Sequence, residues 1–201
     1  MVGFLILHLL DEEEFIMGTV YSSILPKHEE FIRKQRIFFV GSAPLTANGH
    51  VNISPKGHDV LRIFSSNEVA YLDLTGSGNE TSAHLKDNGR ITFMFLAFEG
   101  PPMILRLYGS GNVILPGTPE WTDMAKYFDI LPGARQIIHA KIETVKTSCG
   151  FSVPFYSYDG ERDTLQKWAT NKSEQDLEEY RKKKNSISMD GIVTPIGEKF
   201  S

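Results

Sequence analysis

Residues 68–81 read EVAYLDLTGSGNET, and they indicate the fold more clearly than any other stretch. The first seven residues carry aliphatic and aromatic side chains at a density typical of a strand, and the composition then changes abruptly to Gly, Ser and Asn. Asn79 can cap a following helix by accepting from an otherwise unpaired backbone amide, and Gly89 can end that helix in a left-handed conformation. The stretch therefore predicts a strand, a flexible loop and the start of a helix in direct succession.

Short runs of β-branched and aromatic residues continue on both sides of this stretch. Between two of them, Asn48-Gly49 indicates a tight hairpin, because this pair readily adopts the positive φ that such turns need. Further strands are expected at residues 37–40, 50–54, 60–63, 90–98, 103–114 and 136–145, and helices at 26–35 and 120–128, with one long or two broken helices in 164–184. Many strands with few helices, and no regular strand–helix–strand alternation, predict a mainly β barrel with flanking helices.

The bulk composition limits the classes of protein to consider. The chain has 201 residues, which is enough to form one hydrophobic core. Its formal net charge is −4 and its pI is near 5.9. A nucleic-acid surface needs clustered Lys and Arg, so no nucleic-acid partner is expected; the one basic run, at residues 181–184, is short. The only cysteine is Cys149, so no disulfide within the chain is available and a reducing, intracellular setting is expected.

The first residues are expected to form neither a membrane anchor nor a signal peptide. The apolar stretch at residues 2–10 is interrupted by His8 and falls far short of the ~20 residues that span a bilayer. It also lacks the preceding basic residues and the cleavage site of a signal peptide. We therefore expect no membrane partner and a cytoplasmic location with access to the nucleus. Residues 1–17 are expected to form an arm, disordered or loosely docked, on a single domain at residues 18–201.

The loop at residues 75–81 is the first candidate binding site. A loop that opens onto a helix N-terminus can present amides and hydroxyls to a phosphate, helped by the positive end of the helix dipole. The lysine and glycine spacings of a Walker loop or a dinucleotide fingerprint are absent. Glycine and serine in such a loop are more often simply turn residues, so both interpretations stay open.

Two cations and three histidines are further candidates. Lys56 follows an expected strand and can point into a cleft, although a solvated turn lysine is as good an interpretation. Arg106 lies inside an otherwise apolar strand, where its charge needs solvent, a carboxylate or an anionic ligand. His50, His58 and His84 have no metal-ligand spacing, and no metal site is expected. No serine lies in a nucleophile-elbow motif, so hydrolysis has little support.

Several short motifs together resemble those of a known family. In chain order they are FFVGSAP at 38–44, GHVNISPKG at 49–57, YLDLTGSGNET at 71–81, RIT at 90–92, FEGPP at 98–102, LRLYG at 105–109, SCG at 148–150, GERD at 160–163 and DG at 190–191. As a set they are similar to a subgroup of the pyridoxamine 5'-phosphate oxidase-like proteins. The resemblance covers residues 30–192.

The resemblance implies a six-stranded split β-barrel of the FMN-binding type. It further implies a homodimer with FMN in two symmetric clefts between subunits, in which residues 51–56 line the flavin ring and residues 73–81 approach the ribityl chain and phosphate. The cofactor would carry the redox chemistry, so no catalytic side chain is assigned. The candidate cofactor-binding residues are Asn52, Ile53, Ser54, Lys56, Asp73, Leu74, Thr75, Ser77, Asn79, Thr81 and Arg106.

The chain also departs from the oxidase proper. That enzyme has adjacent Arg and Lys before an Ala-His pair, whereas Thr81 and Ser82 precede Ala83-His84 here. Two cations are thus missing from the expected phosphate site, and Lys56 and Arg106 are the residues that could compensate. The oxidase's carboxy-terminal substrate-binding pattern is also not recognisable after residue 168.

Three hypotheses follow from these observations. The first is an FMN-dependent oxidoreductase of unknown small-molecule substrate that is not pyridoxamine 5'-phosphate oxidase itself. The second is a redox-inactive barrel that serves as a binding or interaction protein. The third keeps the barrel and replaces the ligand with deazaflavin or haem; no haem-ligating motif is evident, so it ranks last.

Overall fold

The computed structural model describes residues 18–201, and the expected arm at residues 1–17 lies outside the described part. The strands are β1 (Val20–Tyr21), β2 (Phe38–Ser42), β3 (Asn52–Lys56), β4 (Leu61–Ser65), β5 (Glu68–Leu74), β6 (Arg90–Leu96), β7 (Ile104–Ile114) and β8 (Ala134–Ser148). The helices are α1 (Pro26–Lys34), α2 (Glu80–Asn88), α3 (Pro119–Ala125), α4 (Thr164–Thr170), α5 (Glu174–Asn185) and α6 (Pro195–Glu198).

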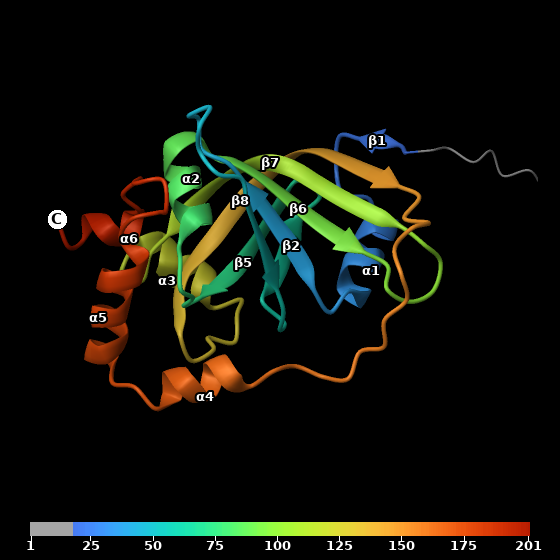
Figure 1. Cartoon of the computed structure of the whole chain (residues 1–201). Coiled ribbons are helices and arrows are strands. Elements are labelled where there is room, and N and C mark those ends of the chain that lie inside the picture. Colours follow the sequence, from blue (N-terminus) through green and yellow to red (C-terminus); the bar gives the residue numbers. More distant parts are fainter. Residues whose placement is uncertain (1–17) are drawn as a thin grey trace, which may run out of the picture.

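The strands form one antiparallel sheet with the order β3-β2-β6-β7-β8-β5-β4, and β1 pairs with β8. Figure 1 shows this sheet curled around the core, with α1 at one end and α2, α5 and α6 at the other. The mainly β class with flanking helices is confirmed. The expected number of six strands is too low, because the sheet has eight strands; short strands such as the two-residue β1 carry too little pattern to be seen in the sequence.

Apolar side chains from both halves of the sheet fill the barrel. Along β6 buried residues alternate with half-buried ones, which is the period of a strand with one face on a core. Each fully buried aromatic or aliphatic side chain contributes about 2 kcal/mol to folding relative to an exposed one. The largest of these side chains are Tyr71, Phe93, Phe95, Leu72, Leu105, Leu107, Ile137 and Ile138.

The two long strands β7 and β8 are bent at a change of register between Tyr108 and Gly109. A Cβ on Gly109 would lie 1.9 Å from the backbone oxygen of Lys141, so only glycine allows the strands to approach this closely. The bend lets β8 pair with β7 on one side and with β5 and β1 on the other. It therefore helps to bring the start of β8 beside the end of β5, where the candidate site lies.

The predicted hairpin at Asn48-Gly49 is wrong in its turn type. β2 and β3 are joined by residues 43–51, and neither Asn48 nor Gly49 has a positive φ. Glycine is needed at position 49 for space, because a Cβ there would lie 2.2 Å from Cγ of Pro44. Packing against the Pro44 ring across the loop, and not the φ of the turn, requires glycine at position 49.

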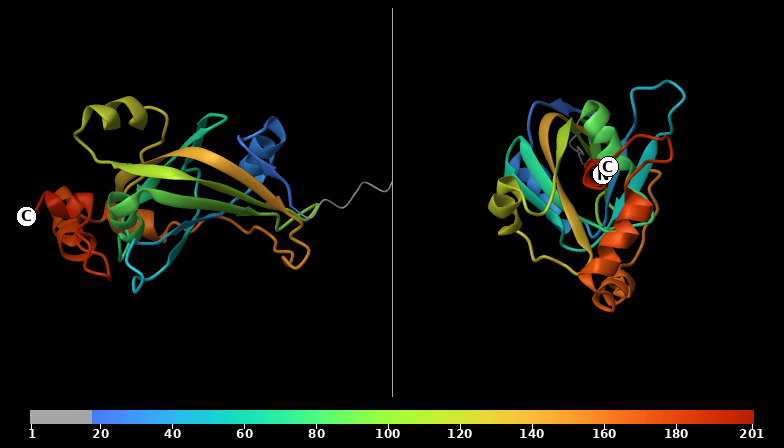
Figure 2. Two further views of the ribbon diagram at one scale, coloured as in Figure 1. Left: turned by 90° about the horizontal axis from the view of Figure 1, so that it is seen from above. Right: turned by 90° about the vertical axis from the view of Figure 1, so that its left-hand side faces the viewer.

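Helices α1 to α5 follow the sequence prediction closely, whereas α6 was not predicted. α1 and α2 begin and end within one or two residues of the expected positions, and Gly89 ends α2 with a φ of 75°. The charged region at 164–184 forms two helices, α4 and α5, seen as separate ribbons in Figure 2. The Ser173 side chain caps α5 by accepting from the amide of Asp176, which accounts for the break. No helix in the described residues is long and apolar enough to cross a membrane.

Candidate functional site

A buried carboxylate, Asp73, lies at the centre of the candidate site. The residue lies near the end of β5 and is 2% exposed, and its carboxylate accepts hydrogen bonds from three side chains. Lys56 Nζ lies 2.8 Å from Oδ1, while Arg135 Nε and Gln136 Nε2 each lie 2.8 Å from Oδ2. β3 and β5 do not pair in the sheet, so the Lys56–Asp73 ion pair links the two strands across the split of the barrel.

The ion pairs fix the protonation state of Asp73. Burial alone would raise the pKa of this carboxyl, because a charge is poorly solvated inside the protein. The charges of Arg135 and Lys56, together with the hydrogen bonds from both, outweigh burial and hold the pKa of Asp73 well below its usual range. Asp73 is therefore a structural anion, and it consumes much of the positive charge that Lys56 brings to the site.

The loop that follows β5 is held by the same cluster. Arg135 Nη1 donates to the carbonyl of Gly78 at 2.8 Å, and Gln136 Nε2 donates to Oδ1 of Asn79 at 2.9 Å. The expected side-chain cap of α2 by Asn79 is not formed, because its carboxamide oxygen is engaged by Gln136 instead. The side chains at the start of β8 thus fix the shape of the loop.

Helix α5 holds the loop from the other side. Arg181 Nε donates to Oγ1 of Thr75 at 3.1 Å, and Arg181 Nη2 donates to the carbonyl of Ala134 at 3.1 Å. One turn later, Asn185 Nδ2 donates to the carbonyl of Gly76 at 2.9 Å. Arg181 forms no ion pair with any described residue, so its guanidinium contacts neutral oxygens only.

Arg181 is a partly buried cation with little local compensation. Burial lowers the pKa of Arg181 most; the charge of Glu174 raises this pKa, that of Arg135 lowers it, and that of Glu178 raises it. Burying a charge that lacks a close partner costs free energy, and an added anion would recover it. Two guanidiniums therefore converge on the loop, and of these only Arg135 forms an ion pair with a described carboxylate.

The inner face of β3 continues the polar network. Asn52, Ser54 and Lys56 alternate with exposed residues, so they share one face of the strand. Asn52 Nδ2 donates to Oγ1 of Thr81 at 3.0 Å and to Oγ of Ser54 at 3.2 Å. Of the predicted residues, the structure brings together Asn52, Ser54, Lys56, Asp73, Thr75, Asn79 and Thr81.

Three predicted residues lie apart from this network. Ile53 points away on the outer face of β3 and is 67% exposed. Ser77 is exposed at the tip of the loop. Arg106 pairs in register with Lys146 on β8 and donates to Ser148, roughly 30 Å along the strand from the residues that hold Asp73. Within one chain Arg106 therefore cannot replace the missing cations.

A cleft of about 1670 Å³ opens beside the network. Lys56, Leu74 and Thr75 contribute to its barrel wall, and the opposite wall is the strap, which we define as residues 151–163. The strap runs from the end of β8 to α4 along the outside of the barrel (Figure 1). The described lining carries six basic residues, Lys27, Arg33, Lys34, Arg36, Lys56 and Arg162, against three acidic ones, Glu30, Glu99 and Glu161.

The sequence prediction missed Arg135, Gln136, Arg181 and Asn185. The first two stand at the start of a strand that was expected to begin at Gln136, and the last two belong to a charged helix with no visible pattern of contacts. The basic run at 181–184 was the one available signal for Arg181. No group of three or more His, Cys, Asp and Glu side chains in residues 18–201 could hold a metal ion.

Comparison with known proteins identifies the family. The family model described as pyridoxamine 5'-phosphate oxidase matches residues 24–149. The chain belongs to this family. The pyridoxamine 5'-phosphate oxidase family protein ustO of Aspergillus flavus is 36% identical over 193 residues, covering 88% of this chain and 77% of that protein.

A solved structure supports the fold. A HupZ variant from Group A Streptococcus superposes with a TM-score of 0.50 at 20% identity, covering 61% of this chain and 97% of that chain.

The residues present fit the flavin mononucleotide that the family implies. A flavin phosphate needs cations and free amides, and a flavin ring needs an open cleft. Arg181 supplies a cation without an ion-pair partner among the described residues, Arg135 adds one that is paired with Asp73, and the backbone amides of residues 76–79 donate to no other described residue. The cleft beside Lys56 and Thr75 is large enough for the ring system.

Proposed function

We propose that this protein is an FMN-dependent oxidoreductase acting on a small molecule, and that it is distinct from pyridoxamine 5'-phosphate oxidase itself. The observation that carries the proposal is the basic cleft, because six basic and three acidic residues line it on a chain whose formal net charge is −4. Three of the six basic residues are already paired with carboxylates, whereas Lys27, Arg36 and Arg162 form no ion pair with a described residue, and their positive charge in an acidic protein favours an anionic ligand. Family membership supports flavin as that ligand.

In this proposal each part of the site has a distinct task. Bound FMN would supply the hydride chemistry. Lys56 and Thr75 would face the flavin from the barrel wall, while Arg135 and Arg181 would set the positive potential at the loop that receives the phosphate. The strap would exclude water from the opposite side of the cleft. No side chain of the chain would act as a nucleophile.

One observation favours a second candidate, a redox-inactive binding barrel. Lys56 is already paired with Asp73, and the carboxylate of Glu80 lies in the first turn of α2, where it accepts from the amide of Met189. A carboxylate at a helix N-terminus occupies the place that a phosphate would take. In this alternative the polar network stabilises the barrel, and the cleft binds a molecule other than flavin.

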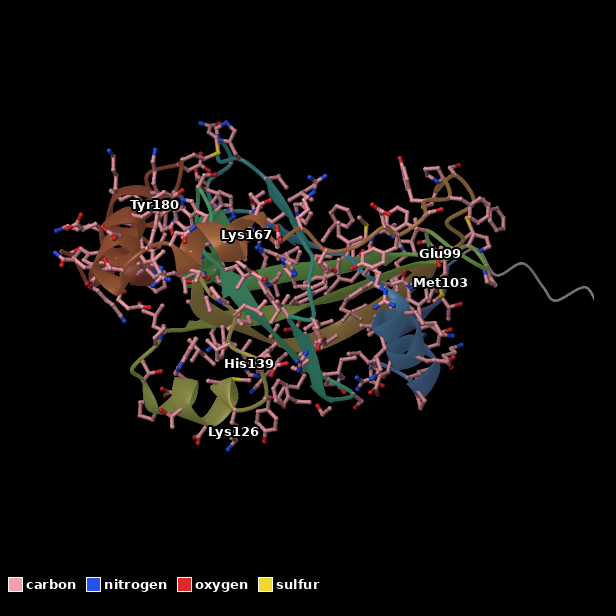
Figure 3. The ribbon with its side chains drawn as sticks, turned by 90° about the horizontal axis from the view of Figure 1, so that it is seen from below. Glu99, Met103, Lys126, His139, Lys167 and Tyr180 are labelled. Atoms are coloured by element: carbon pink, nitrogen blue, oxygen red, sulfur yellow. The ribbon has the colours of Figure 1, made fainter. Side chains whose placement is uncertain are left out.

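A flavin titration separates the two candidates. Quenching of FMN fluorescence by the purified full chain should saturate, and riboflavin, which lacks the phosphate, should bind at least about tenfold more weakly, or about 1.4 kcal/mol. Adding NADPH to the loaded protein should bleach the visible absorption of the flavin. Lys56→Gln should weaken FMN binding, whereas Lys126→Gln on the far side of the barrel should not (Figure 3). A protein that binds neither flavin supports the redox-inactive barrel.

We also propose that the protein works as a homodimer in the cytoplasm. The outer face of edge strand β3 exposes Ile53, and Val51 just before the strand is 72% exposed, so this edge has apolar side chains to cover. Light scattering at micromolar concentrations should give twice the mass of the chain. A monomer at these concentrations rules the dimer out.

A further inference from the structure

The cleft is larger than one ligand needs. Binding sites for single drug-sized molecules have volumes of roughly 300–1,000 Å³, whereas this cleft has about 1670 Å³. Its two walls also differ in chemistry. The barrel wall holds the Lys56–Asp73 pair, and the strap wall carries the exposed side chains of Tyr156, Tyr158 and Arg162 together with the carboxylate of Glu161.

Hydrogen bonds join the strap to the barrel near Phe98 and near His58. Near its middle, the amide of Tyr156 donates to the carbonyl of Phe98 at 3.2 Å, and the two rings meet edge to face at 5.5 Å. Further along, Oε2 of Glu161 accepts from the amide of His58 at 3.1 Å and lies 3.3 Å from His58 Nδ1. The hydroxyl of Tyr158 donates to Oε1 of the same carboxylate at 2.9 Å.

The barrel side of the second attachment is built to receive Glu161. His58 is the only residue besides glycine in the described chain with a positive φ, at 65°. A Cβ on Gly57 would lie 3.2 Å from Oε2 of Glu161, so the glycine leaves room for the carboxylate. Strained backbone of this kind is usually retained where it positions a functional group. The attachment fixes Arg162, the next residue, near the Lys56 end of the cleft.

Two cations on this side of the cleft have no carboxylate partner. Arg36 is exposed, and its guanidinium lies 5.3 Å from the centre of the Tyr158 ring. Arg162 is exposed as well, and neither arginine forms an ion pair with any residue in the described range 18–201. Of the three acidic lining residues, Glu30 pairs with Lys34 and Glu161 is engaged as described. Glu99 lies in the turn between β6 and β7, next to Phe98, the residue that Tyr156 contacts (Figure 3).

The aromatic rings make this a surface for a flat molecule. Tyr156 is 64% exposed and Tyr158 is 47% exposed, although both line the cleft. Exposed tyrosines offer a large rigid face for stacking at a low cost in conformational entropy. A guanidinium over one of these rings adds a charged group that can bind a carboxylate or similar anion.

We infer that the strap half of the cleft is the substrate subsite and that it binds a planar aromatic anion, held by Arg36 and Arg162 and stacked on Tyr156 and Tyr158. This inference rests on the proposed function only in assigning the barrel half to flavin. The binding of an aromatic anion at the strap is a separate property, so the two proposals can fail independently.

Calorimetric titration with naphthoate and with its neutral analogue naphthamide tests the inference. The full chain should bind naphthoate at least about tenfold more tightly than naphthamide, because a charge-assisted pair is stronger than a neutral contact. Arg36→Gln and Arg162→Gln should each remove most of this preference, while Tyr158→Ala should weaken both ligands. Lys126→Gln is the matched control, since Lys126 is also exposed and lies 5.5 Å from a tyrosine ring, but on the opposite side of the barrel (Figure 3).

The titration is repeated with saturating FMN to separate the two halves of the cleft. Unchanged naphthoate affinity supports a substrate subsite beside the flavin. Displacement of naphthoate by FMN overturns the inference, because the strap half would then hold the flavin itself. Three other outcomes also overturn the inference: equal affinity for naphthoate and naphthamide, no saturable binding of naphthoate, or wild-type affinity for naphthoate in both arginine variants. Naphthoate binding by a protein that binds no FMN would support the subsite and contradict the proposed function.

Discussion

Replacing Asp73 with asparagine should destabilise the protein strongly. The substitution keeps the shape of the side chain but removes the only negative charge between Lys56 and Arg135, both within 2.8 Å of it. Breaking a buried ion pair costs about 3–5 kcal/mol, because the partner charges are left uncompensated. At about 2–4 °C per kcal/mol for a domain of this size, the melting temperature should fall by about 10 °C.

The same substitution should change how stability depends on pH. The pKa of Asp73 is lower in the folded protein than in the unfolded chain, whose carboxyl titrates near 3.9 as in model peptides. The stabilisation from Asp73 is therefore complete above the unfolded pKa and is lost as the pH falls towards the folded pKa. The difference in unfolding free energy between wild type and Asp73→Asn should stay constant near neutral pH and shrink below about pH 4.

Urea unfolding followed by circular dichroism at a series of pH values measures both effects. Asp59→Asn is the control, because Asp59 also pairs with an arginine at 2.8 Å, but its side chain is 87% exposed. That control should lose less than about 1 kcal/mol. The reasoning would be refuted if Asp73→Asn stayed within about 1 kcal/mol of wild type at neutral pH and the difference did not change on acidification.

Two further pairs of variants test the fold and the site. Gly109→Ala should destabilise the protein by about 3 kcal/mol or more, since its Cβ would lie 1.9 Å from the backbone oxygen of Lys141. Its control is Gly41→Ala, which should cost about 1 kcal/mol or less in the same unfolding assay, because its Cβ would meet nothing closer than 3.9 Å. Arg181→Gln should weaken FMN binding about tenfold and leave riboflavin binding almost unchanged. Lys183→Gln, which alters an exposed cation on the same helix, should affect neither; equal losses for both flavins in Arg181→Gln would contradict a phosphate contact.

The local sequence pattern was sufficient to predict most of the helices and strands, but not the contacts between them. The strand at residues 68–74 was predicted with its observed bounds, and Gly89 ends α2 as expected, because both depend on neighbouring residues only. The turn at Asn48-Gly49 was predicted wrongly, since the need for glycine there comes from the ring of Pro44 across the loop. Steric requirements between segments leave no local signature in a single sequence.

The site shows the same limit more sharply. The strand–loop–helix pattern predicted Thr75 and Asn79 as candidates and the family resemblance added Asp73, and the structure brings them into one network. Their cationic partners lie 62 residues away at Arg135 and 106 residues away at Arg181. A search for the missing cations close to Thr81 could not have found residues that reach the loop from another strand and another helix.

The two cations also differ in what their removal can reveal. Arg135 pairs with Asp73 and supports the barrel, so a variant at this position changes stability and binding together. Arg181 contacts only the hydroxyl of Thr75 and the carbonyl of Ala134. Its loss leaves no buried carboxylate unpaired, and Thr75 keeps its own hydrogen bonds to Gly133. A change in anion affinity in Arg181→Gln can therefore be assigned to the lost charge, which makes this residue the more direct probe of a phosphate at the loop.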